Sequence, residues 1–327
     1  MKYANVDGLI VSRLVLGTGY FGTQMNDDLS AQMLTRYIEA GGNMVDSGHV
    51  YADWVPGVER STSEKCLGRL FKKNPDLRKK ILVSTKGAHY DVLSSEYVSR
   101  VRPDCIKEDI DGSLQCLNTD FIDFYWLHRD DPKYPVQPIM DELFDAQDSG
   151  KIGHIGASNW TNERIDEANK YASQVGRKGF VANQISFAYA KNLEPGGVGA
   201  EPDTTMLYFR EPEDIEYYRQ HKELTIFSYT SQANGYISKI LNNKPLSEFV
   251  RRVYDCPTNR ARAHRAGKLA EKYGVSPEAI GLEYQYTRGF EVCTVIGPRS
   301  MEQLNDTLTA ADFIMSEDDI KYLETDE

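Results

Sequence analysis

The stretch at positions 45–54, VDSGHVYADW, gathers side chains that can do chemistry, namely Asp46, His49, Tyr51 and Asp53. A histidine beside an aspartate is typical of a metal site, whereas a phenol close to a carboxylate can transfer a proton. The stretch alone does not decide between these two chemistries. The partners that the rest of the chain supplies have to be found first.

Two further polar groups follow apolar, strand-like runs in the way that Asp46 does. Lys86 stands in STKG after the run at 81–83, and His128 follows FYWL at 124–127. Each of them comes one strand-and-helix unit after the group before it. If parallel strands end at these positions, Asp46, Tyr51, Lys86 and His128 lie side by side.

Such a cluster would polarise a carbonyl group. Asp46 would keep Lys86 protonated, and the lysine cation would favour the phenolate of Tyr51, so that the pKa of Tyr51 falls from about 10 towards the working pH. Tyr51 then becomes a general acid and base, while His128 orients the substrate oxygen or shares the proton. The sequence offers no serine or cysteine triad at the same place. A hydride from a bound nicotinamide would supply the missing nucleophile.

The chain alternates strand-like apolar runs with helical segments, which predicts a (β/α)8 TIM barrel. We expect strands at Leu14–Gly17, Met44–Val45, Ile81–Ser84, Phe121–Trp126, Ile152–Ile155, Val181–Gln184, Leu224–Ser228 and Val292–Ile296. We expect helices at Ser30–Ala40, Ser61–Phe71, Cys105–Leu117, Pro138–Ser149, Asn162–Gln174, Glu211–His221, Asn259–Tyr273, Pro277–Arg288, Met301–Leu308 and Ser316–Leu323.

The barrel is expected to form a single domain over residues 1–327, with an N-terminal β-hairpin that turns at Asp7-Gly8. Two long connections, Asn192–Arg210 and Tyr229–Thr258, would lie over the catalytic face. An open doubly wound sheet is the alternative. GTGYFG at 17–22 has the G-x-G-x-x-G spacing of that fold, but the residues after it do not open an amphipathic helix.

Composition restricts the partners. The 327 residues carry a formal net charge of −11, which argues against nucleic acid and anionic membranes because both attract basic surfaces. The sequence has neither a run of roughly 20 apolar residues nor a signal-peptide pattern, so we expect a soluble, cytoplasmic protein that acts on a small molecule. The five cysteines form no CxxC pair, which indicates reduced thiols and no metal site. The sequence does not indicate an oligomeric state.

A series of motifs in a fixed order resembles the aldo-keto reductases. The motifs are GTGYFG, the Asp46 and Tyr51 pair, STKG at 84–87, DFYWLHRDD at 123–131, GKIGHIGASNW at 150–160, ANQISFAYA at 182–190, SYTSQANG at 228–235 and VIGPRSMEQL at 295–304. The resemblance covers nearly the whole chain. It implies an NAD(P)(H)-dependent barrel oxidoreductase for carbonyl or alcohol substrates, with Tyr51 as proton donor, Asp46 and Lys86 tuning it, and His128 positioning the carbonyl.

The resemblance also implies contacts to the dinucleotide. The residues expected at the nicotinamide are Thr18, Ser158, Asn159, Gln184 and Tyr229. Those expected along the pyrophosphate and adenosine are Ser231, Gln232, Gly297, Arg299 and Gln303. Because Arg299 offers a permanent, forked cation to a 2′-phosphate, NADP(H) is favoured, with NAD(H) as the alternative.

Four residues around the catalytic set are candidates for the substrate site: Tyr20, His49, Trp54 and Arg129. Together with Asp53 they would suit a polar substrate such as a sugar or polyol.

The chain departs from the family pattern at two places. It has Asp46-Ser47-Gly48 where most relatives have Asp-Thr-Ala, which puts the backbone support of the site in question. It has Thr307 where an asparagine is common, which weakens adenine recognition.

Two other functions stay open. Lys86 could be the Schiff-base nucleophile of a barrel aldolase, although this needs a neutral amine, which Asp46 opposes. The chain could instead be a nucleotide-binding, redox-sensing or regulatory subunit with little turnover.

Overall fold

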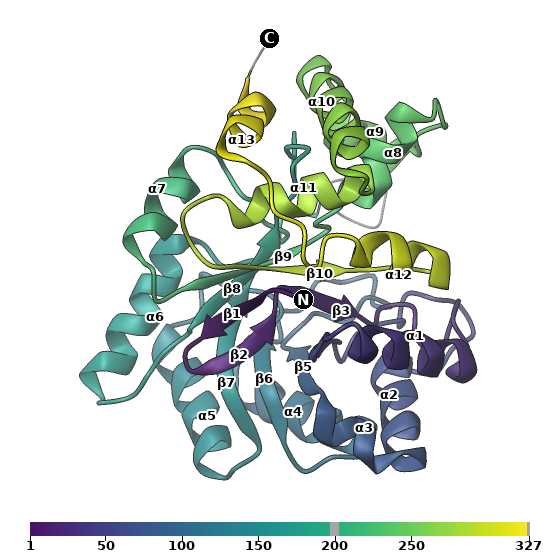
Figure 1. Cartoon of the computed structure of the whole chain (residues 1–327). Coiled ribbons are helices and arrows are strands. Elements are labelled where there is room, and N and C mark those ends of the chain that lie inside the picture. The colour runs from purple at the N-terminus through teal and green to yellow at the C-terminus, as the bar shows by residue number, and fades with distance from the viewer. Residues whose placement is uncertain (197–202, 326–327) are drawn as a thin grey trace. The chain divides into compact units, whose positions relative to one another are not determined.

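The computed structural model describes residues 1–196 and 203–325. The chain divides into two compact units, Val15–Asn183 and Met1–Leu14 with Gln184–Glu327. An antiparallel hairpin of β1 (Tyr3–Val6) and β2 (Leu9–Ser12) opens the chain, as expected (Figure 1). The single-domain organisation stays a prediction.

In the unit Val15–Asn183, parallel strands alternate with helices (Figure 1). The strands are β3 (Leu14–Gly17), β4 (Met44–Asp46), β5 (Leu82–Gly87), β6 (Ile122–Leu127) and β7 (Ile152–Ser158). The helices are α1 (Asp27–Glu39), α2 (Thr62–Lys73), α3 (Pro75–Lys80), α4 (Pro103–Leu117), α5 (Val136–Asp148) and α6 (Asn162–Gln174). In the register of the strands, Asp46 pairs with Ser84 and Lys86 with Trp126. The carboxyl ends of β4, β5 and β6 therefore lie at the same end of the barrel.

Local sequence explains these elements. β6 is an apolar and aromatic run with one aspartate, typical of a strand covered on both faces. The side chain of Asn26 caps α1 by accepting a hydrogen bond from the Leu29 amide. A Cβ added at Gly68 of α2 would lie 2.1 Å from the carbonyl oxygen of Cys116 in α4. The backbones of α2 and α4 are therefore in direct contact at Gly68, where no larger residue fits.

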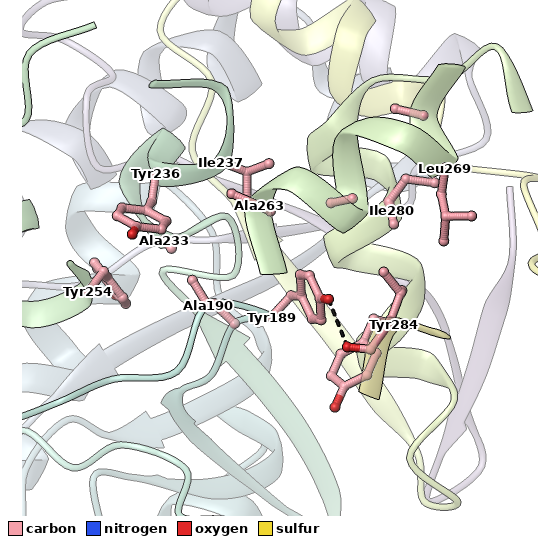
Figure 2. Packing of buried hydrophobic residues seen from close by; sticks show 14 of the residues in the cluster. Tyr189, Ala190, Ala233, Tyr236, Ile237, Tyr254, Ala263, Leu269, Ile280 and Tyr284 are labelled. Atoms are coloured by element: carbon pink, nitrogen blue, oxygen red, sulfur yellow. Dashed lines mark hydrogen bonds between the residues drawn. The ribbon is translucent and has the colours of Figure 1, made fainter. Parts of the chain in front are cut away.

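The second unit contains β8 (Ala182–Ser186, which starts just before the division), β9 (Thr225–Tyr229) and β10 (Val292–Ile296). Its helices are α7 (Glu213–Gln220), η1 (Ala233–Gly235), α8 (Tyr236–Leu241), α9 (Glu248–Tyr254), α10 (Pro257–Tyr273), α11 (Pro277–Tyr286), α12 (Met301–Leu308) and α13 (Glu317–Glu324). An apolar core holds α8 to α11 together (Figure 2). There the rings of Tyr189 and Tyr284 lie 4.7 Å apart, and the Tyr189 hydroxyl donates to the carbonyl of Leu323 at 2.9 Å.

The barrel strands are hydrogen-bonded in the closed order β10-β3-β4-β5-β6-β7-β8-β9. The predicted (β/α)8 barrel is confirmed. Every helix within residues 1–196 and 203–325 is too short or too polar to cross a lipid bilayer.

Several boundaries differ from the predictions. Helix α1 begins three residues before Ser30, because Asn26 caps it and Ser30 is buried within it. Strand β5 continues to Gly87, so Lys86 lies inside a strand instead of after one. The connection after β9 folds into η1, α8 and α9, which the sequence did not predict. In the connection Asn192–Arg210, residues 197–202 lie outside the described residues.

Candidate active site

A buried ion pair lies where β4 and β5 run side by side. Asp46 and Lys86 are each 1% exposed, and Lys86 Nζ donates to Asp46 Oδ2 at 2.5 Å and to the Ser47 carbonyl at 2.5 Å. The second carboxylate oxygen of Asp46 accepts from Ser84 Oγ at 2.8 Å. Burial by itself would lower the pKa of Lys86, but attraction by Asp46 and Tyr51 outweighs it and raises that pKa. Lys86 is therefore an ammonium ion at neutral pH.

Tyr51 stands on the turn that follows β4, with its amide bonded to the Gly48 carbonyl at 2.9 Å. Lys86 Nζ lies 4.6 Å from the centre of the phenol ring. The prediction that the pKa of Tyr51 falls towards the working pH is wrong. Burial raises this pKa above its ordinary value, Asp46 adds to the rise, and Lys86 offsets only a part of it. Tyr51 thus holds its proton and is available as a donor.

His128 follows β6, and its amide donates to the Gly87 carbonyl at 2.8 Å. Its ring centre lies 5.8 Å from that of Tyr51. Burial, reinforced by repulsion from His89, Arg129 and Lys86, lowers the pKa of His128 well below its ordinary value. The buried Nδ1 has no hydrogen-bond partner within the described part of the chain. A neutral imidazole carries one ring N–H, which can donate one hydrogen bond to an oxygen beside Tyr51.

The structure adds aromatic groups that the sequence analysis missed. The ring of His89 lies 4.6 Å from that of His128, and Tyr90 and Tyr97 continue the series at 4.3 and 5.1 Å. His89 stands three positions after Lys86. A search of the residues just beyond each strand, and not only at its end, would have found it.

Of the residues expected at the substrate, Trp54 lies beside Tyr51. Its ring is 5.9 Å from that of Tyr51 and the residue is 39% exposed. Arg129 is buried, with one guanidinium nitrogen donating to the His128 carbonyl at 2.9 Å. Tyr20 is half-buried, and its carbonyl accepts from the Met25 amide at 3.1 Å.

His49 has partners on α2 and α4. Its Nδ1 lies 2.9 Å from Glu64 Oε2 and 3.3 Å from Ser113 Oγ. Nδ1 of His49 is therefore engaged by side chains of α2 and α4. Its role at the substrate stays a prediction that these contacts do not favour.

His49, Glu64 and Cys116 also offer ligand atoms that lie within 4.8 Å of one another. Both oxygens of Glu64 already accept hydrogen bonds, from His49 and from Thr85 Oγ1. Burial and the Glu64 charge raise the pKa of Cys116 to about 11, so its thiol is protonated. His49 and Glu64 are thus hydrogen-bonded to each other, and the absence of a metal stays a prediction.

Three residues expected at the nicotinamide belong to the unit Val15–Asn183. The hydroxyl of buried Thr18 lies 3.2 Å from the Asp46 carbonyl and 2.9 Å from Ser63 Oγ. Asn159, in a left-handed conformation with φ 60°, donates to the His128 carbonyl at 3.3 Å and to Ser158 Oγ at 3.1 Å. Thr18 and Asn159 are thus tied directly to the backbone of catalytic candidates.

In the second unit, the loop after β9 is tied to β10 and α12. Ser231 Oγ donates to the Val295 carbonyl at 2.7 Å, and Gln232 Nε2 donates to Thr307 Oγ1 at 3.1 Å. Thr307 in turn donates to the Gln303 carbonyl at 2.9 Å. Thr307, which departs from the family pattern, therefore orients Gln232, which was expected to contact the cofactor.

The other expected cofactor residues in this unit differ in exposure. Gln184 is buried, and the Tyr229 hydroxyl donates to the Leu207 carbonyl at 3.1 Å. Gln303 Oε1 accepts from the amide of exposed Arg299 at 2.8 Å, and a Cβ at Gly297 would meet nothing within 4 Å. The exposed cation of Arg299, the open backbone at Gly297 and the amide side chains of Gln184 and Gln303 have chemistry that suits a dinucleotide.

The family model described as "Aldo/keto reductase family" matches residues 13–325. The protein belongs to the aldo/keto reductase family. The resemblance read from the motifs is confirmed, and the chain is an oxidoreductase of this family, whose members generally use nicotinamide cofactors.

Known aldo-keto reductases and oxidoreductases are similar over nearly the whole chain. The uncharacterized oxidoreductase YrpG of Bacillus subtilis is 23% identical, with 98% of this chain and 94% of that protein covered. The norsolorinic acid reductase of Emericella nidulans is 25% identical, with 97% and 78% covered. A crystal structure of the thermostable aldo-keto reductase Tm1743 with the inhibitor epalrestat has a TM-score of 0.71 at 19% identity, with 100% of both chains covered.

In this aldo-keto reductase, Gly48 makes room for Tyr51. A Cβ added at Gly48 would lie 2.9 Å from Tyr51 Cδ1 and Cε1, closer than carbon atoms can approach. The departure from the Asp-Thr-Ala pattern thus has a steric reason, since an alanine here would displace the phenol.

We predict that Gly48→Ala lowers kcat for nicotinamide-dependent reduction about 10- to 100-fold, because a displaced phenol no longer meets the substrate oxygen. Steady-state kinetics measures the effect. The matched control is Gly19→Ala, whose Cβ would lie at an ordinary 3.8 Å from Tyr51 Cδ2 and should change little. Wild-type kcat in Gly48→Ala would contradict the steric account.

Proposed function

We propose that the protein transfers hydride between NAD(P)(H) and a carbonyl or secondary alcohol, with Tyr51 as general acid and base. The observation that carries the proposal is the grouping of three side chains in one compact unit, where Lys86 Nζ lies 4.6 Å and the His128 ring centre 5.8 Å from the centre of the Tyr51 ring. Tyr51 keeps its proton, Lys86 keeps its charge, and His128 is neutral with an unpartnered ring nitrogen. A proton donor, a fixed cation and a neutral hydrogen-bond donor are what reduction of a carbonyl oxygen requires.

In the reduction, the substrate oxygen accepts hydrogen bonds from the Tyr51 hydroxyl and from a ring N–H of His128. These bonds withdraw electron density from the carbonyl carbon. The nicotinamide, when bound, supplies the hydride to that carbon. Tyr51 gives its proton to the developing alkoxide, and Lys86 stabilises the phenolate that remains. In the reverse direction the same phenolate removes the proton of an alcohol.

Lys86 is unsuited to the alternative of Schiff-base chemistry. Its raised pKa keeps it charged, and its Nζ already donates to Asp46 and Ser47. A nucleophilic lysine has to be a free amine.

The aromatic surroundings of Tyr51 favour a substrate with a flat, apolar group on the carbonyl. Trp54 and His128 flank Tyr51, and His89 and Tyr90 extend the aromatic series. The polar groups that were expected to bind a sugar, His49 and Arg129, are engaged within the protein. Such a substrate is a free small molecule, and the cysteines, all of them free thiols, suit a cytoplasmic setting.

NADP(H) is the cofactor that the second unit favours. Burial and repulsion from Arg299 both lower the pKa of Lys239, which indicates a second cation close to Arg299. The sequence analysis did not identify Lys239. Two neighbouring cations gain from an anion between them, and a 2′-phosphate would provide it.

We predict that Tyr51→Phe abolishes turnover of benzaldehyde and related carbonyls while the protein still binds NADPH, because only the proton donor is lost. Nicotinamide absorbance reports turnover, and quenching of tryptophan fluorescence reports binding. The control is Tyr171→Phe, which removes an exposed hydroxyl bonded to Asp141. Near-normal turnover in Tyr51→Phe would rule out this mechanism.

We predict that Arg299→Ala raises the KM for NADPH about 10-fold, with little change for NADH, since one charge-assisted contact to the 2′-phosphate is lost. Kinetics with both cofactors measures the difference. Arg177→Ala removes a half-buried arginine paired with Asp148 and serves as the control. Equal effects on the two cofactors would contradict a 2′-phosphate contact.

A further inference from the structure

Tyr51 lies at the middle of a turn whose two flanks are both attached to the start of α2. The geometry points to His49 and Asp53 as positioning residues, which hold the Tyr51 turn against the strand of Lys86 through Ser61 and Glu64. This inference rests on the proposed function of Tyr51 and replaces the substrate-binding role that the sequence suggested for His49 and Asp53.

The flank before Tyr51 is fixed at His49. The His49 amide donates to the Lys86 carbonyl at 2.9 Å, which extends the β4–β5 pairing towards the turn. The His49 carbonyl accepts from Ser61 Oγ at 2.7 Å, and Nδ1 lies 2.9 Å from Glu64 Oε2. The amide of His49 is thus bound to β5, and its carbonyl and side chain are bound to the start of α2, which leaves the turn little freedom.

The flank after Tyr51 is fixed at Asp53. Its Oδ1 accepts from the Ser61 amide at 2.7 Å, and the residue is 7% exposed. Ser61 precedes α2 in a left-handed conformation with φ 56° and makes no capping hydrogen bond with its side chain. Instead, the Ser61 hydroxyl donates to the His49 carbonyl, and the Ser61 amide donates to the Asp53 carboxylate. Ser61 therefore binds both flanks of the turn at once.

The carboxylate of Glu64 carries the connection on to β5. Glu64 is fully buried in the first turn of α2, and its Oε1 accepts from Thr85 Oγ1 at 2.5 Å. Thr85 precedes Lys86, and because side chains alternate along a strand, it points away from the side on which Lys86 lies. One buried carboxylate therefore binds the neighbour of Lys86 and the flank of the Tyr51 turn.

The consequence is a fixed separation between the phenol and the ammonium. Proton transfer depends steeply on distance, and a misplacement of about 1 Å can cost about 100-fold in rate. The bonds described above act on the backbone around Tyr51 and not on a bound substrate. Arg60 lies 3.6 Å from Asp53 but is largely exposed, so this ion pair adds little.

The first test compares two substitutions of Asp53. Asp53→Asn keeps an oxygen that accepts from the Ser61 amide, so kcat and KM should stay near wild type. Asp53→Ala removes the acceptor, so kcat should fall about 10- to 100-fold with KM for substrate and cofactor changed less than about threefold. If the charge of Asp53 instead binds the substrate, both variants should raise the substrate KM by the same factor. This result would overturn the inference.

The second test applies the same logic to His49. Asparagine places an amide N–H near the position of Nδ1, so His49→Asn should restore most of the kcat that His49→Ala loses. Equal losses in both variants, or none in His49→Ala, would overturn the inference. Glu283→Gln is the matched control, because it changes a buried carboxylate bonded to Lys2 in the other unit and should leave kcat unchanged.

Hydrogen exchange followed by mass spectrometry tests the attachment without turnover. Peptides covering residues 44–54 should exchange faster in Asp53→Ala and His49→Ala than in wild type, and the asparagine variants should not differ from wild type. Unchanged exchange in both alanine variants would overturn the inference. Absence of any nicotinamide-dependent turnover in the wild-type protein would refute the proposed function alone, since the exchange result does not depend on it.

Discussion

The buried pair of Lys86 and Asp46 is the interaction on which the rest of the site depends. A charge removed from water is costly unless it is paired and its hydrogen-bonding capacity is used. Here Ser84 completes the carboxylate, the Ser47 carbonyl accepts from the ammonium, and the parallel register of β4 and β5 brings all four groups to one place. The strand pairing therefore positions the ion pair.

Burial keeps both Tyr51 and His128 uncharged, but the two neutral groups have different functions in the site. Both lie close to the ammonium, and in both cases burial opposes the charged form. The phenol consequently remains a donor and the imidazole remains uncharged. In the proposed mechanism, Lys86 leaves the proton on Tyr51 before the reaction and stabilises the phenolate after the proton has been transferred.

The sequence predicted the barrel and the polar residues on neighbouring strands, because strand-helix alternation and the positions of Asp46, Lys86 and His128 are local features. It could not predict the pKa of Tyr51, which depends on how completely the folded chain encloses the phenol. Nor could it assign His49, whose partners Glu64 and Ser113 come from helices that only the fold places around it. In sequence, a histidine between Asp46 and Tyr51 looks equally suited to a substrate.

The proposed mechanism depends most directly on Lys86 being a buried ammonium ion held by Asp46. NMR of protein carrying carbon-13 in its lysine side chains, with Lys86→Met used to assign the signal, reports the charge of Nζ as the pH is raised. We expect the Lys86 signal to stay that of an ammonium ion beyond about pH 10, since the pKa is raised above its ordinary value. A signal that changes to a neutral amine near pH 7 would contradict the account and favour Lys86 as a nucleophile.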